Sequence, residues 1–183
     1  MDTLSAYHEA GHATVSLLYG ELPDRVTIRA DGDSAGHTAL LGVEARAILK
    51  AAVRGRTAAD RGRVLSYLVG LAAGPVAQSL HMRRGVRRDF IDRTSWETFG
   101  GGQDYEQLQF FVAGRARGLE DVTGDDIASE AFDLLEQPDI WAAVTHVAED
   151  LRRFGELDYQ GIFDAVHNRD AIKTQSTADR IGS

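Results

Sequence analysis

The chain of 183 residues contains no cysteine and only three prolines. Without cysteine it can form neither a disulfide framework nor a thiolate metal site, so any metal ligands must be histidines and carboxylates. No apolar run suits a membrane span, because the longest, residues 64–80, is interrupted by glycine, proline and glutamine. The N-terminus also does not show the basic and then apolar pattern of a secretory signal. We therefore expect a cytoplasmic protein without a membrane segment.

The composition is typical of one globular domain. The hydrophobic fraction is 43% and the charged fraction is 26%, and the length is sufficient for a hydrophobic core. No internal repeat or long linker divides the chain. We expect one domain over residues 1–170, followed by a disordered polar tail over residues 171–183.

The net charge of −8 conceals an uneven distribution of charged side chains. Basic residues predominate between residues 43 and 93, with an arginine-rich region over 54–93, and acidic residues predominate between 94 and 170. The basic region could contact nucleic acid or an acidic partner. However, it contains no nucleic-acid-binding motif and no interleaved aromatic residues. We therefore expect two solvated faces of opposite charge and do not expect nucleic acid as a partner.

Hydrophobic periodicity predicts a mainly helical α+β fold with a small β-hairpin. A first helix over residues 3–19 is capped by Asp2 or Thr3 and ended by Gly20 and Pro23. Alternating residues over 25–30, turn residues over 31–34 and a returning stretch over 36–41 predict the hairpin. Further helices are expected over residues 43–53, 63–80 and 138–155. One helix should begin at residue 104, another should run from a cap at residues 123–126 to residue 136, and a last one should follow residue 158. Between them we expect a break over 55–62, a kink or restart at Pro75 and a loop over 83–102.

The segment His8-Glu9-Ala10-Gly11-His12 matches the H-E-x-x-H motif. Histidines four apart on a helix lie about 40° apart around its axis and one turn along it, so both rings can reach one ion. Glu9 projects beside that ion without binding it, where it can accept a proton from water. The motif also arises by chance on surface helices, but this helix is otherwise apolar, so half-buried histidines would need partners. The segment therefore predicts a zinc site, because zinc prefers four ligands including imidazole and carboxylate.

The motif does not determine the third ligand. The longer motif H-E-x-x-H-x-x-G-x-x-H, which takes its third ligand from the same segment, is excluded. Val15 stands at the position of its glycine and Leu18 at the position of its last histidine. Glu44 lies on a helix roughly thirty residues downstream, where a third glutamate ligand is common, but no supporting carboxylate is next to it. Asp104 follows three glycines and opens a helix, where it could turn inward or simply cap the helix.

From about Ser5 to Asn168 the chain resembles the zinc peptidase domain of the FtsH-type AAA proteases. The segment Ala6-Tyr7-His8-Glu9-Ala10-Gly11-His12-Ala13 is similar to that family's zinc helix, and Gly102-Gln103-Asp104-Tyr105-Glu106-Gln107 looks like its third-ligand segment. Three weaker similarities occur in the same order along the chain as in the family. They cover the hairpin residues 26–28 and 36–38, residues 69–80, and residues 151–166.

The resemblance implies that His8, His12 and Asp104 bind one zinc ion and that Glu9 is the catalytic base. We accordingly expect a zinc metalloendopeptidase that hydrolyses flexible or unfolded polypeptides, with the hairpin sheet beside the zinc helix. A peptide could add as an extra strand at the edge of the hairpin.

The chain also departs from the family pattern. Gln78 and Ser79 replace an acidic pair, one member of which supports a zinc-binding histidine; Gln78 can still accept a hydrogen bond from a ring N–H, but without a charge. Pro75 stands where the family usually has a residue compatible with a continuous helix. The spacing from His12 to Asp104 is longer than in the family, mostly because of the residues around 54–63 and 83–93. No G-x-x-x-x-G-K-[ST] segment for nucleotide binding is present. An alternative is therefore a catalytically weak or inactive binding or regulatory module. A separate ATPase or self-association is a further expectation.

Overall fold

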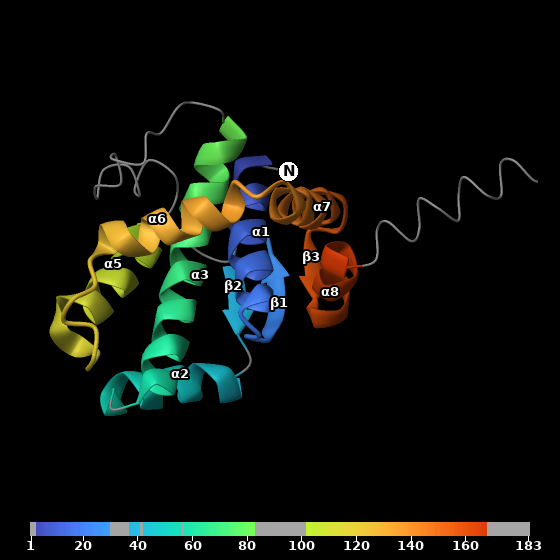
Figure 1. The fold of residues 1–183 in the computed structure, drawn as a ribbon. Coiled ribbons are helices and arrows are strands. Elements are labelled where there is room, and N and C mark those ends of the chain that lie inside the picture. The colour runs from blue at the N-terminus through green and yellow to red at the C-terminus, as the bar shows by residue number, and fades with distance from the viewer. Residues whose placement is uncertain (1–2, 30–36, 41, 56, 83–101, 168–183) are drawn as a thin grey trace, which may run out of the picture.

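The computed structural model describes residues 3–29, 37–40, 42–55, 57–82 and 102–167 (Figure 1). Within these ranges the expected α+β, mainly helical class is confirmed, and no helix is long and apolar enough to cross a membrane. The predicted tail and most of the predicted loop over 83–102 lie outside the described residues. The elements in chain order are α1 (Thr3–Leu18), β1 (Pro23–Thr27), β2 (His37–Leu40), α2 (Gly42–Arg54), α3 (Ala58–Met82), α5 (Gly102–Phe110), the π-helical turn η1 (Phe111–Arg115), α6 (Gly124–Leu135), α7 (Pro138–Phe154), β3 (Glu156–Asp158) and α8 (Tyr159–His167).

Helix α1 is the most deeply buried of the described elements. It lies between α3 on one side and α7 on the other (Figure 1), and every residue from Ala6 to Ser16 is buried. The helix ends at Leu18, one residue before the predicted end, and Gly20 follows with a φ of 74°, a left-handed conformation that favours glycine. Because α1 is enclosed on all sides, its polar side chains must find partners inside the protein.

Small residues allow α1 and α3 to pack very closely. A Cβ atom added at Gly11 would lie 2.4 Å from the carbonyl oxygen of Ala73 and 2.7 Å from Cβ of Ala77. The element that approaches closely at Gly11 is therefore α3, and not the segment that carries the predicted third ligand.

Helix α3 is longer than predicted. It begins at Ala58 because Thr57 caps it, with the Thr57 hydroxyl accepting a hydrogen bond from the Asp60 amide at 3.0 Å. The predicted break over 55–62 is therefore confined to the residues around Gly55. The predicted restart at Pro75 is wrong, since the helix continues to Met82. Pro75 removes one helical hydrogen bond, but it lies in a continuous buried stretch, from Leu68 to Ser79, whose packing supports the helix.

The sheet has three antiparallel strands in the order β2-β1-β3. The predicted hairpin is present as β1 and β2, although β1 starts at Pro23 and ends at Thr27. The third strand was not predicted, because three residues are too few to show an alternating pattern. It forms because Gly155, with φ of 81°, ends α7 and turns the chain back along β1. Among the described strands, β2 pairs with β1 alone and leaves its other edge unpaired.

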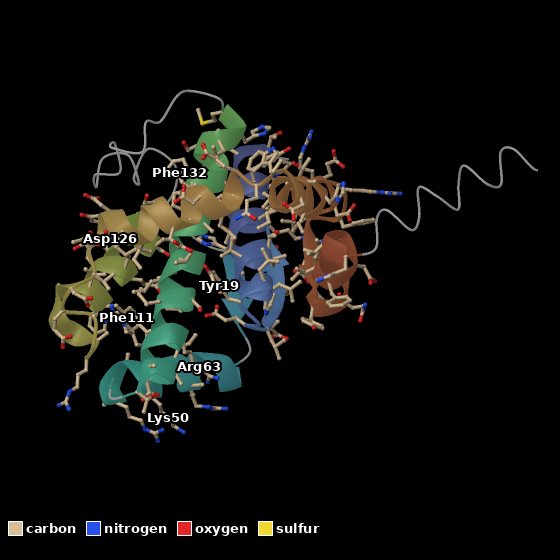
Figure 2. The ribbon with its side chains drawn as sticks, in the orientation of Figure 1. Tyr19, Lys50, Arg63, Phe111, Asp126 and Phe132 are labelled. Carbon is tan, nitrogen blue, oxygen red and sulfur yellow. The ribbon has the colours of Figure 1, made fainter. Side chains whose placement is uncertain are left out.

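The later helices agree with the sequence predictions. Thr123 and Asp126 form the expected capping box at the start of α6, with hydrogen bonds in both directions. The π-helical turn η1 was not predicted. Within the arginine-rich region, Arg61 donates two hydrogen bonds to the Asp121 carboxylate, at 2.8 and 3.0 Å, and ties the start of α3 to the loop before α6. Lys50 and Arg63 lie at the same end of the molecule (Figure 2).

Replacing Gly11 with alanine should destabilise the protein by about 1–3 kcal/mol, because the added methyl group meets a backbone oxygen that cannot move independently of α3. The matched control is Gly62→Ala on α3, where an added Cβ has nothing within 4 Å. That change should stabilise the protein by about 0.5–1 kcal/mol through helix propensity. Chemical denaturation of the two variants measures both effects. A neutral Gly11→Ala would show that the two helices are not in this close contact.

Candidate metal centre

The three motif residues on α1 are all buried. His8, Glu9 and His12 have exposed fractions of 7%, 6% and 8%. The two imidazole rings meet nearly edge to face, with centroids 4.7 Å apart and an interplanar angle of 82°. Their Nε2 atoms are 3.0 Å apart and point into the same space. The spacing of four residues thus places both rings side by side, as the helical geometry predicts.

Asp104, in the first turn of α5, brings its carboxylate to the same point. Its Oδ2 lies 3.2 Å from Nε2 of His8 and 3.3 Å from Nε2 of His12. A triangle with sides of 3.0, 3.2 and 3.3 Å has a circumradius of about 1.8 Å, so one position lies about 2.0–2.2 Å from all three atoms, the usual zinc–ligand distance. The three side chains therefore form a group that could hold a metal ion.

Helix α3 orients the ring of His12. The Nδ1–H of His12 donates a hydrogen bond of 2.8 Å to the carbonyl oxygen of Gly70, so the lone pair of Nε2 faces the shared point. One turn further along α3, a Cβ atom at Gly74 would lie 2.2 Å from Nε2 of His12. Gly70 supplies the acceptor for the ring, and Gly74 supplies the space that the ring occupies.

The electrostatics of the group require a shared positive charge. Burial lowers the pKa of His12, but the Asp104 carboxylate, the Glu9 charge and the Gly70 carbonyl outweigh it and raise the pKa to about 9. Burial raises the pKa of Asp104, but His12 and His8 outweigh that effect and hold the pKa well below its usual range. Either a proton on His12 or a metal ion can supply the charge, so metal binding would compete with protonation.

Glu9 lies outside the three converging groups, as predicted for a residue that is not a ligand. Its Oε2 accepts a hydrogen bond of 2.7 Å from the hydroxyl of Thr38, which also donates to the Glu9 backbone carbonyl at 3.3 Å. Thr38 belongs to β2, so the hairpin fixes the orientation of the Glu9 carboxylate. The carboxylate is also close enough for its charge to act on His12.

Three other residues singled out from the sequence, Glu44, Gln78 and Ser79, have different outcomes. Glu44, the competing third ligand, lies in α2, but its side chain is outside the described residues. Gln78 and Ser79 are buried, with exposed fractions of 7% and 4%. For His12 the acceptor of the ring N–H is the Gly70 carbonyl and not Gln78. A backbone carbonyl thus supports the His12 ring, and the support that Gln78 could give to a ring N–H stays a prediction.

Sequence reasoning did not identify Gly70, Gly74 or Thr38. A signal for the first two was available, because Gly70 and Gly74 have the small-x-x-x-small spacing that lets helices approach closely. Thr38 had no such signal, since its role depends on how the hairpin packs on α1.

No protein-family model matches the chain, and no curated protein matches it.

Replacing Gly74 with alanine should displace the His12 ring and weaken zinc binding by at least about tenfold. The free energy of unfolding should fall as well, because displacing the buried ring breaks its hydrogen bond to the Gly70 carbonyl. The matched control is Gly70→Ala, one turn away, where an added Cβ would meet only the Ser16 hydroxyl at 3.2 Å. Competition with a chromophoric chelator measures the affinities. Comparable zinc affinity in the two variants would contradict the assigned role of Gly74.

Proposed function

We propose that the chain is a zinc-dependent metalloendopeptidase similar to the peptidase domain of the FtsH-type AAA proteases. The observation that carries this proposal is the convergence of His8, His12 and Asp104 within 3.0–3.3 Å of one another. Beside them the Glu9 carboxylate is oriented by Thr38. Two imidazoles and one carboxylate in a buried setting form the donor set of a catalytic zinc site with one open position.

Zinc suits this group better than the other common divalent ions. Magnesium and calcium prefer six or more oxygen ligands, whereas this group offers two nitrogens and one oxygen among the described residues. When bound, zinc supplies Lewis-acid chemistry, which polarises a carbonyl oxygen and acidifies water.

The roles of the chain's own residues follow from their positions. Glu9 accepts a proton from the attacking water and passes it to the leaving amine, which is general acid–base catalysis by one carboxylate. Thr38 donates a hydrogen bond to Oε2 of Glu9 and so directs the carboxylate during both transfers. The Gly70 carbonyl keeps the proton of His12 on Nδ1, which leaves Nε2 free to act as a ligand.

The unpaired edge of β2 is the proposed place for the substrate. This strand carries Thr38 and therefore lies directly beside Glu9. An extended peptide that adds to this edge would be held by main-chain hydrogen bonds, which tolerate many sequences. The substrate class is therefore a flexible or unfolded polypeptide. The absence of cysteine is compatible with a reducing cytoplasmic setting, where a separate ATPase or self-association could deliver or confine such chains.

The second candidate is a binding or regulatory module with the same fold and little activity. It is favoured by Gln78 and Ser79, which are buried and uncharged where the resembling family has an acidic pair. The buried and oriented Glu9 favours the peptidase instead, since a module that only binds would have no use for a proton acceptor at this position.

Replacing Glu9 with glutamine should leave zinc affinity nearly unchanged and reduce peptide hydrolysis by about 10²–10⁴-fold, because the change removes the base and not a ligand. Asp104→Ala is the companion variant and should lose zinc and stability together. Metal content after dialysis and hydrolysis of an unfolded protein distinguish the two variants. Equal loss of zinc in both would contradict this division of roles.

The isolated chain should cleave unfolded proteins and leave stably folded ones intact. Unfolding a typical domain requires about 5–15 kcal/mol, and these 183 residues contain no phosphate-binding loop that could couple nucleotide hydrolysis to that work. Rates on one substrate in its folded and unfolded forms, with and without ATP and with a chelator, test this. ATP stimulation of the pure chain would reveal a nucleotide site. If zinc-loaded protein cleaves none of a broad set of unfolded substrates, the binding module becomes the better account.

A further inference from the structure

Helix α5, which carries Asp104, is short. It is nine residues long, and Leu108 is its one fully buried residue. A helix of this length is marginal by itself in water, so tertiary contacts must hold it in place. The position of Asp104 therefore depends on the contacts between α5 and its neighbours.

Tyr67 on α3 makes one of these contacts and also meets the residue that directly follows α5. Its hydroxyl donates a hydrogen bond of 2.8 Å to Oε1 of Gln107, which lies three residues after Asp104 and so next to it on the helix surface. Its ring also meets Phe111 edge to face, with centroids 5.7 Å apart and an interplanar angle of 73°. Phe111 is buried and follows α5 directly (Figure 2).

Tyr67 also lies close to the residue that supports the His12 ring. It precedes Gly70, the acceptor for the His12 ring, by three residues, which is about one turn of α3. One turn of α3 thus contacts both the His12 ring and the helix that carries Asp104. Burial and the carboxylates of Glu21 and Asp104 raise the pKa of Tyr67 to about 12, so its hydroxyl keeps its proton at neutral pH and remains a donor.

We propose that Tyr67 is a positioning residue for the metal site. Through its hydrogen bond to Gln107 it holds α5 at the distance from α1 at which Asp104 reaches both histidines. This inference rests on the zinc site proposed above. Among the described residues Tyr67 makes no hydrogen bond to any of the three ligands. It acts through the placement of Asp104.

Tyr67→Phe removes the hydroxyl and keeps the ring against Phe111, so it tests the hydrogen bond alone. Zinc affinity should fall about three- to tenfold, the usual effect of one lost hydrogen bond. Gln107→Leu should have the same effect, and the double variant should be no weaker than either single one. Ser66→Ala is the control, because among the described residues its hydroxyl bonds within α3, to the Gly62 carbonyl, and zinc affinity should be unchanged.

A second measurement separates positioning from a general effect on the fold. In an Asp104→Ala background, two histidines remain, and their affinity can be measured with Cu²⁺, which imidazoles bind more tightly than Zn²⁺. Adding Tyr67→Phe to this background should leave the Cu²⁺ affinity unchanged, because the residue through which Tyr67 acts is gone. A further loss there would show a general effect on the fold and overturn the inference.

The outcomes for the inference and for the proposed function differ. Wild-type zinc affinity in Tyr67→Phe overturns the inference and leaves the peptidase proposal in place. A wild-type chain that binds no zinc overturns the proposed function and the inference with it. A loss confined to chains that contain Asp104 supports both.

Discussion

The close packing of α1 against α3 is the contact on which the rest of the structure depends. Gly11 removes the side chain that would otherwise strike the backbone of Ala73, so the two helix axes can approach. At this separation the Gly70 carbonyl reaches the Nδ1–H of His12, and Gly74 leaves room for the rest of the ring. The same contact that forms the core therefore also selects the tautomer and the direction of the His12 ring, a candidate metal ligand. A wider spacing would leave a buried histidine without its acceptor, which is costly in an apolar interior.

The candidate metal centre combines elements that are far apart in the chain, and each contributes a different part of it. Helix α1 carries the two imidazoles and Glu9, α5 carries the carboxylate ligand, α3 orients the His12 ring and contacts α5, and β2 orients Glu9. A carboxylate and two imidazole lone pairs around one point repel one another unless a positive charge is present between them. The raised pKa of His12 and the lowered pKa of Asp104 are the two consequences of this arrangement.

The separation of Glu9 from the ligand group has a functional meaning under the peptidase proposal. A carboxylate that bound the metal would lose the freedom to accept a proton, whereas the hydrogen bond from Thr38 holds Glu9 beside the site without occupying a ligand position. Because Thr38 belongs to the strand with the unpaired edge, substrate binding and the orientation of the base would share one element.

The sequence by itself determined the elements whose signals are local. The spacing of His8 and His12 placed both rings on one helix face, Gly20 ended α1, and Thr123 with Asp126 capped α6, because each effect acts over a few neighbouring residues. The residues alone left the third ligand open, because a helix cap and a ligand look the same in a sequence, and it was the family resemblance that favoured Asp104. Only the tertiary structure decided that Asp104 turns toward the histidines, that Gly70 and Gly74 receive the His12 ring, and that the short strand β3 completes the sheet. These features depend on contacts between segments separated by dozens of residues, and no local pattern encodes the distance between two packed helices.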